Sequence, residues 1–450
     1  FILVQAILAL TILTALGAGG NASDTGGFFW WILTVALFIG TPLRGFNALS
    51  SEDRLKTMDI ILLTRLTAWR ITFGKWAALV SQSALFVASV LPYVVLRYFL
   101  GGVNVLVEVA WVVIILFISA ILTAITVGFS AHKFFLIRGT VAIGVIILGF
   151  TAAGSLYGLF FETNDLPFSL SSTGWLAYLG SAMVGLFAIY YVLDMGATFI
   201  APAAENHATR KRLSSLAVIS LLLISVFFGA DPEVIFTVAA IIGGVVCFDA
   251  LTETPNLLPS IFAPFVRKGV LVSLTGRFLY PGWHSAVWFT TIIAGALALY
   301  AHQFGYYSDR EFAHTLIAVI NMFVFPLAII QLFFRKAPQV FAMYVLIQCI
   351  TALFSLLIFI IAETIGGSLG PNAYWIGCFL PLLLLIGGLE YSSLLTPFSI
   401  VASSMLFLSV AVLITRSIPI LRRTSEIERE IAARLNTADA KPQSQPPSEP

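Results

Sequence analysis

The chain has few charged residues. Asp, Glu, Lys and Arg make up 10% of its 450 residues, and 59% are hydrophobic, whereas soluble globular proteins carry about 25% charged residues. This number of charges is too small to cover the surface of the protein with water-compatible groups. Lipid must therefore be the solvent for most of the chain. The net charge of +2 gives no basis for a nucleic-acid partner, and none is expected.

Motifs that carry chemistry are also scarce. Cys247, Cys349 and Cys378 lie in apolar runs and form neither a metal-ligand pattern nor a disulfide framework. The five histidines do not cluster, so no metal site is expected. Gly74-Lys75 lacks the upstream glycine and the following Ser or Thr of a phosphate-binding loop. We therefore expect no catalytic residue, metal or cofactor in this chain, and any ATP must be hydrolysed by a partner subunit.

Long apolar runs are abundant instead. In lipid every backbone polar group must be satisfied internally, so apolar runs of about 20 residues predict helices. The sequence predicts an all-α polytopic membrane protein of about twelve transmembrane helices, in two six-helix halves, plus one re-entrant segment at 373–390. The expected spans are near 1–17, 28–45, 76–99, 104–128, 134–160, 173–203, 213–230, 233–252, 283–302, 313–334, 338–362 and 396–416.

The distribution of Lys and Arg predicts the orientation, because these residues stay on the cytoplasmic side of the spans. With the 43–75 loop inside and 373–390 re-entrant, only Arg97 and Arg310 of the 24 basic residues fall outside. A thirteenth span at 373–390 would place the basic C-terminal tail outside. We expect a multi-pass protein of the cell inner (plasma) membrane with a cytoplasmic C-terminus. Because Phe1 opens inside an apolar run, we expect a truncated start.

Three parts are expected along the chain. The first half, 1–205, carries a cytosolic loop at 46–75, and the second half, 206–420, carries one at 253–282. The first loop begins with Phe-Asn-Ala-Leu-Ser at 46–50, and the second loop directly follows the similar segment Phe-Asp-Ala-Leu-Thr at 248–252. Residues 421–450 form a tail, with a short amphipathic helix and then a Pro- and Ser-rich disordered end.

The loop at 46–75 carries the main functional signal. Ile60, Leu63, Thr67 and Ile71 recur at helical spacing, which predicts a short amphipathic helix between two spans. Such a helix either lies in the lipid headgroups or couples an external ATPase to the membrane helices. The spacing alone leaves both open.

A wider pattern in this loop resembles the permeases of type-2 ATP-binding-cassette exporters. It consists of an acidic residue, a Thr-x-Asp-x-x-Leu-Leu-Thr core and a Gly-Lys pair before the next span, followed by Leu91-Pro92 and Gly101-Gly102. The resemblance implies that these residues contact a cytosolic ATPase subunit: Glu52, Thr57, Asp59, Leu63, Thr64, Gly74 and Lys75. The family usually has Gly where Thr57 stands, and residues 206–450 resemble it by topology only.

The resemblance implies the function of an exporter permease, with ATP used by the partner and with substrate moved outward. Membrane lipids are the other expected partners, and assembly as a homodimer or a heterodimer is left open. Ionisable residues inside spans are costly in lipid, so Asp194 and Glu108 are candidates for the transport path, against a structural pairing role. Two alternatives remain: a membrane-embedded transferase acting on lipid-linked substrates and an ion-coupled secondary carrier.

Overall fold

The computed structural model describes residues 2–17, 22–54, 66–100, 104–162, 174–305, 309–334, 339–365 and 370–439, and all regular elements within them are helices. Eleven of these helices are long and apolar enough to cross a membrane, and Val4–Thr14 and Pro381–Glu390 are shorter apolar helices. The protein is therefore a multi-pass, all-α membrane protein. The first expected span is one of the shorter helices, because α1 (Ile2–Gly17) has only 16 residues.

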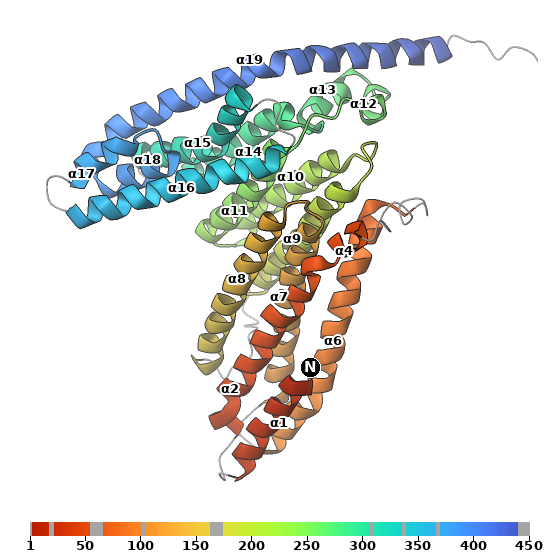
Figure 1. The fold of residues 1–450 in the computed structure, drawn as a ribbon, viewed down its shortest axis with the longest axis vertical. Helices are drawn as coiled ribbons and strands as arrows, with labels where there is room; N and C mark the ends of the chain where they lie inside the picture. The colour runs from red at the N-terminus through yellow and green to blue at the C-terminus, as the bar shows by residue number, and fades with distance from the viewer. Residues whose placement is uncertain are drawn as a thin grey trace, which may run out of the picture. The chain divides into compact units, whose positions relative to one another are not determined.

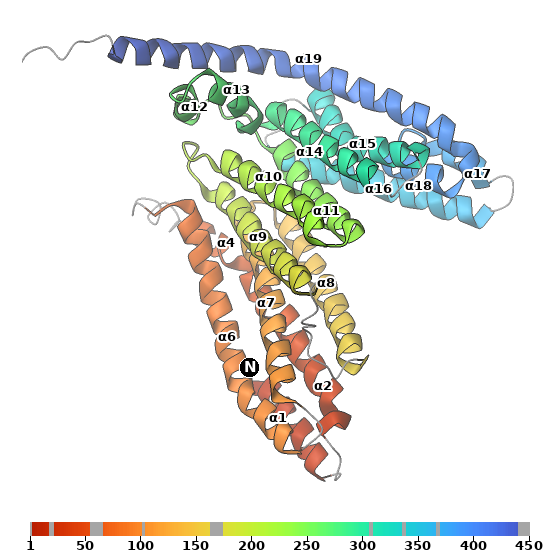
Figure 2. The same cartoon turned by 180° about the vertical axis from the view of Figure 1, so that it is seen from behind.

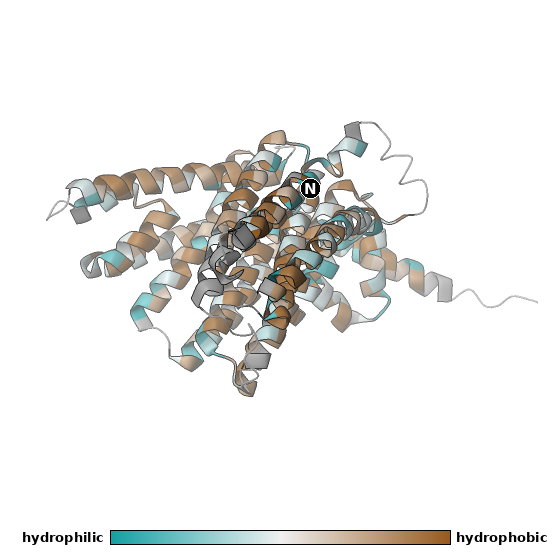
Figure 3. Cartoon of the chain, turned by 90° about the horizontal axis from the view of Figure 1, so that it is seen from below, coloured by the Kyte–Doolittle hydropathy of each residue, from teal (hydrophilic) through white to brown (hydrophobic). Residues whose placement is uncertain are grey.

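Hydrophobic side chains also lie on the outer faces of the helices. Leu85, Leu136 and Phe407 are each more than 70% exposed, and hydrophobic colour runs along nearly all helices in Figure 3. Soluble monomers rarely expose apolar surface on this scale. These faces are the ones that contact lipid chains.

The chain divides into two compact units, Phe1–Pro202 and Ala203–Pro450. Figure 1 and Figure 2 show the helices of each unit. The first unit contains α1, α2 (Ala22–Val35), the π-helix η1 (Ala36–Gly40), α3 (Thr41–Leu43), the 3₁₀ helix η2 (Arg44–Asn47), α4 (Ser50–Arg54), α6 (Ala68–Leu100), α7 (Val105–Ser130), α8 (Phe135–Glu162) and α9 (Gly174–Ile200).

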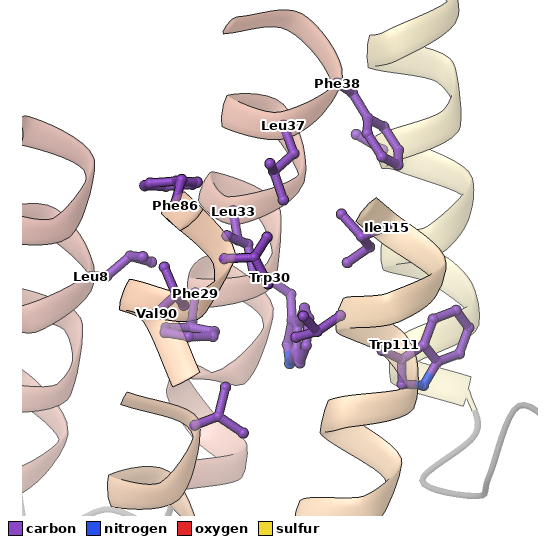
Figure 4. Close-up of a cluster of buried hydrophobic side chains, with 14 of the residues drawn as sticks. Leu8, Phe29, Trp30, Leu33, Leu37, Phe38, Phe86, Val90, Trp111 and Ile115 are labelled. Atoms are coloured by element: carbon purple, nitrogen blue, oxygen red, sulfur yellow. The ribbon is translucent and has the colours of Figure 1, made fainter. Parts of the chain in front are cut away.

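A buried cluster holds α1, α2, α6 and α7 of the first unit together. Figure 4 shows side chains of this cluster from each helix, with Phe29 of α2 beside Leu8 of α1 and Val90 of α6, and Leu33 of α2 beside Phe86 of α6. Trp111 and Ile115 come from α7. The start of α7 is fixed by Asn104, whose side chain accepts a hydrogen bond from the Leu106 amide at 3.0 Å.

Helices α7 and α9 approach closely through glycines. A Cβ atom added at Gly196 would lie 2.6 Å from the Cα of Gly128, and one at Gly128 would lie 2.5 Å from the Val192 carbonyl oxygen. Small residues let membrane helices pack backbone to backbone, where dispersion contacts replace the absent hydrophobic driving force. This contact fixes the part of α9 that carries Asp194.

The second unit begins with a short link and ends in a long helix. Its elements are α10 (His207–Ser225), η3 (Val226–Phe228), α11 (Pro232–Thr252), α12 (Pro259–Val266), α13 (Val270–Leu279), α14 (Trp283–Phe304), α15 (Asp309–Phe333), α16 (Val340–Ile365), α17 (Gly370–Ala373), η5 (Tyr374–Gly377), α18 (Pro381–Glu390) and α19 (Ser392–Asp439). Asp231 caps α11 by accepting from the Glu233 amide at 2.9 Å, with Pro232 in the first turn.

Two segments of the second unit differ from a simple sequence of spans. Residues 373–390 contain no helix long enough to cross a bilayer, because the ten residues of α18 rise only about 15 Å against a core of about 30 Å. The last span and the expected tail helix are instead one helix, α19, of 48 residues. Pro419 lies within this helix, just beyond the expected end of the span. Residues 440–450 lie outside the described part of the chain.

Candidate functional site

The expected connector in the first unit starts from α4 and returns to the membrane in α6. Glu52 of α4 and Lys75 of α6 form an ion pair, with Lys75 Nζ 2.6 Å from Glu52 Oε1. The two residues are 23 positions apart, so this contact brings the two ends of the connector together. Thr57, Asp59, Leu63 and Thr64 lie outside the described residues. The structure thus brings together two of the predicted coupling residues, Glu52 and Lys75.

The start of α6 is anchored by aromatic side chains. The rings of Trp69 and Phe73 are stacked with their centroids 5.9 Å apart, and the centroid of Trp69 lies 5.2 Å from that of Tyr190 in α9. Trp76 donates its indole N–H to the Ala120 carbonyl oxygen of α7 at 3.0 Å. Offset and edge contacts of this kind add to the burial energy of the rings. The membrane end of the connector is therefore fixed to both α7 and α9.

Gly74 differs from its neighbours in this segment because it supports no packing. It lies on an exposed face of α6, and a Cβ atom added there would meet no atom within 4 Å. Glycine inside a helix is destabilising by roughly 0.5–1 kcal/mol relative to alanine. Within the described residues, no contact requires a glycine at this position.

The span that precedes the connector is irregular. Between α2 and α4 the backbone passes through the π-helix η1 and the 3₁₀ helix η2. Hydroxyl groups of α7 donate to carbonyl oxygens along this stretch, Ser119 to Leu37 at 2.6 Å and Thr126 to Pro42 at 2.7 Å. Side-chain hydroxyls are a usual way to satisfy backbone groups freed by irregular helices in membranes. These hydrogen bonds from α7 therefore stabilise the irregular backbone of the span.

Asp194 and Glu108, the two expected path residues, do not come together. Asp194 is fully buried in α9 near the glycine contact with Gly128, whereas Glu108 lies in the first turn of α7. Twenty residues of α7 separate Glu108 from Gly128, or about 30 Å along the helix. No joint binding site forms from these two carboxylates, and a path role for Asp194 stays a prediction.

Glu108 is instead paired with a base. Its Oε1 accepts from Arg97 Nη2 at 2.9 Å and from Nε at 3.1 Å, and both side chains are 2% exposed. The guanidinium of Arg97 also lies 4.7 Å from the centre of the Phe29 ring, a favourable cation–π distance. The pairing role that the sequence left open for Glu108 is the one that the contacts support.

The second unit contains a buried charge cluster that the sequence did not predict. Lys211 of α10 lies 2.5 Å from Asp249 Oδ2 and 3.2 Å from Glu253 Oε1, and Arg212 lies 2.6 Å from Glu253 Oε2. The two bases are 2% and 1% exposed. Two bases and two acids balance their charge, which a buried ionic group requires. Burial alone would raise the pKa of Glu253, but Arg212 and Lys211 outweigh it and lower that pKa.

Arg212 also fixes the loop that follows α13. Its Nη1 donates to the Tyr280 carbonyl oxygen and to Ser285 Oγ, both at 2.8 Å, and its Nη2 donates to the Gly282 carbonyl oxygen at 3.2 Å. Gly282 has a φ of +123°, which favours glycine. The guanidinium has the several donors in fixed geometry that such a junction needs.

A second polar contact holds α19 against α13. The carboxylate of Glu428 accepts from Arg277 at 2.7 Å, from the Tyr280 hydroxyl at 2.8 Å and from Ser273 at 3.1 Å. Burial and the bond to Glu428 raise the pKa of Tyr280, and the same carboxylate raises the pKa of Arg277. The expected loop at 253–282 is thus two short helices, α12 and α13, packed on α19. Three of its four prolines, Pro255, Pro259 and Pro264, lie before, at the start of and within α12, and such prolines exclude a single long helix rather than short ones.

The buried cluster left one signal in the sequence. Asp249 lies in Phe-Asp-Ala-Leu-Thr at the end of a span, and Lys211 and Arg212 open the preceding span, so acids and bases meet at the same end of adjacent antiparallel helices. Glu428 carried no such signal, because its partners are about 150 residues away.

Comparisons with known proteins add no relative to this description. No protein-family model matches the chain, and neither a curated protein nor a solved structure matches it. Within the described ranges, no group of three or more His, Cys, Asp or Glu side chains could hold a metal ion. The class defined by the fold is therefore a multi-pass, all-α membrane protein.

Proposed function

We propose that the chain is the membrane permease of an ABC-type exporter, which forms the translocation path and is driven by a separate cytosolic ATPase subunit. The observation that carries the proposal is the pairing of Glu52 with Lys75, two of the residues that resemble the family's coupling loop. The pair closes a connector whose membrane end is anchored on α7 and α9 through Trp69 and Trp76. A force applied to this connector would reach both helices.

Gly74 supports the same proposal. A glycine that no described contact requires, next to an ion-paired lysine, suits close approach by the backbone of another protein. Gly74 also lies on an exposed face of α6, which leaves this backbone accessible. In this function the connector faces the cytoplasm of the inner membrane, the C-terminus is cytoplasmic, and ATP binds only to the partner.

Charge reversal tests the coupling role. In proteoliposomes with the co-purified ATPase subunit, Lys75→Glu is expected to abolish stimulation of ATP hydrolysis, because it replaces the basic partner of Glu52 with a second acid that repels it. The double variant Glu52→Lys/Lys75→Glu restores the pair and should regain part of the stimulation. Lys133→Glu, an exposed base on the α7–α8 loop, is the matched control. Equal stimulation in all four proteins would refute the coupling role.

Isolation from the native membrane tests the exporter class itself. The chain is expected to bring an ATPase subunit with it, and vesicles with both subunits should transport upon ATP addition. If no ATPase accompanies the chain and a proton gradient drives a flux that Asp194→Asn removes, the carrier alternative replaces the exporter. Asp194 is fully buried in α9, so Asp194→Asn changes charge without changing shape.

A second substitution separates contact with the partner from folding. Gly74→Ala is expected to keep or slightly raise the stability of the chain, by up to about 1 kcal/mol, because the added methyl group meets no atom. If the ATPase approaches this backbone closely, the same variant lowers ATP-driven transport. Unchanged transport would remove Gly74 from the coupling surface.

A further inference from the structure

The second unit contains an apolar cavity that the proposed function does not use. It has a volume of about 450 Å³ and lies between α14, α15 and α19, three helices that run side by side in both views (Figure 1 and Figure 2). Ligand pockets in proteins typically measure about 300–1,000 Å³. The cavity is therefore large enough for a ligand.

The cavity is elongated. Its wall on α14 runs from His284 to Ala298 at intervals of three or four residues, which corresponds to about 21 Å along the helix. A slot of this length accommodates one extended acyl chain, because each leaflet contributes about 15 Å to a hydrocarbon core of about 30 Å. The far end is lined by Ala294, Gly295 and Ala298, and a Cβ atom added at Gly295 would meet no atom within 4 Å.

The surroundings of the cavity identify its occupant. The three helices are among those that can span a membrane, and the lining residues Trp288 and Ile414 are 49% and 45% exposed. The cavity is therefore open to the hydrocarbon of the bilayer. An empty slot forfeits dispersion contacts along its walls, and water needs several polar partners, of which this mostly apolar lining offers few. The hydrocarbon chain of a lipid would fill the slot and restore the dispersion contacts of its walls.

One end of the cavity is polar. His284 of α14 and Ser417 of α19 line it, and they lie at the end next to α13, where Arg277 contacts Glu428 of α19. His284 Nδ1 is buried without a hydrogen-bond partner in the described residues. Arg416, which is half-buried, precedes Ser417 on α19 without lining the cavity, and no acidic residue lines the cavity. A base one residue from the polar end and a lining without acids favour an anionic headgroup there.

We propose that this cavity binds one acyl chain of an anionic membrane phospholipid, with the phosphate at the His284–Ser417 end beside Arg416. The site is independent of the ATPase-coupling role, because every wall belongs to the second unit. The bound lipid would stay with the protein as a resident ligand and fill the space between α14 and α19.

Photo-crosslinking of the full chain in nanodiscs tests the site. The probe is phosphatidylglycerol with a diazirine near the end of one acyl chain. Label is expected on α14 and α19 peptides that contain Gly295 and Leu406, and Gly295→Leu should reduce it about tenfold by filling the slot. Gly154→Leu adds the same side chain on an exposed face of α8, where no atom lies within 4 Å, and should leave the label unchanged.

Further variants make the outcome decisive. Ala298→Leu fills the same slot from the next turn and should also lose label, with an elution profile and helix content equal to the native chain. Arg416→Gln should remove most of the preference for phosphatidylglycerol over phosphatidylcholine, whereas Arg423→Gln, an exposed base on α19, should not. Label that is equal in all variants, or spread over lipid-facing residues such as Leu299, would overturn the proposal, because it would indicate surrounding bilayer lipid only.

Discussion

Removal of Lys211 is the perturbation whose effect the structure defines best. Its ammonium group lies 2.5 Å from Asp249 and 3.2 Å from Glu253, and the side chain is 2% exposed. Lys211→Met therefore removes the base that two buried carboxylates share. Loss of one partner from a buried ion pair costs about 3–5 kcal/mol, because the remaining charge stays in a low-dielectric site. We expect a loss of this size in the free energy of unfolding.

The double variant Lys211→Met/Asp249→Leu separates the cost of an uncompensated charge from the cost of lost packing. It removes one base and one acid, so the cluster stays balanced by Arg212 and Glu253. Replacement of a whole buried pair by apolar residues is often neutral or stabilising, so we expect the double variant to recover all but about 1–2 kcal/mol.

Reversible denaturation of the full chain in mixed micelles measures these differences. Trp283, whose amide donates to the Glu253 carbonyl oxygen at 3.0 Å, lies beside the cluster and reports its loss by fluorescence. Lys268→Met, at an exposed position in the same unit, is the control and should stay within about 0.5 kcal/mol of the native chain. If Lys211→Met costs less than about 1 kcal/mol, or if the two substitutions simply add, the cluster does not act as a balanced unit.

Three further predictions concern other contacts. Glu428→Gln replaces a charged acceptor of Arg277 and Tyr280, so amide hydrogen exchange in α13 should accelerate while exchange in α7 stays unchanged. Burial, and then the charge of Arg138, lower the pKa of His132 from 6.5. The contribution of His132 to stability is therefore complete above about pH 6.5 and declines as the pH falls below that value. His132→Asn should flatten this pH dependence in a pH series of unfolding measurements. Gly196→Ala places a methyl group 2.6 Å from Gly128 Cα and should cost about 1–3 kcal/mol in the same unfolding assay, whereas Gly154→Ala, with open space around it, should cost none; equal effects would contradict the close α7–α9 contact.

The helical fold followed from composition because lipid leaves the backbone few alternatives. Low charge and apolar runs of about 20 residues constrain each segment locally, so the spans required no knowledge of their neighbours. Boundaries were less predictable where two local signals conflict. Arg416 and the acidic residues after it indicated that a span ends there, but helix propensity carries α19 on to Asp439.

The contacts of the sites depend on pairings between distant segments. Glu52 and Lys75 were predicted as coupling residues, but nothing in their spacing specified that they touch. His314 is fully buried, with Nε2 2.9 Å from the Leu384 carbonyl oxygen and Nδ1 3.0 Å from Ser399, and nothing in the sequence indicated these partners. Such pairings depend on which helices lie next to each other, and helix periodicity gives only the direction of each face.

The second span contains, in order, α-helical, π-helical, α-helical, 3₁₀ and α-helical turns between Ala22 and Arg54. A π turn is underwound and a 3₁₀ turn is overwound relative to the α-helix, so their pitches offset each other within a few residues. A change in the length of either segment at the expense of α3, which lies between them, would rotate the end of the helix about its own axis. In the proposed function, a push at Glu52 would therefore reach the residues before Gly40 partly as torsion, and the hydroxyls of Ser119 and Thr126 bond the Leu37 and Pro42 carbonyl groups along this stretch.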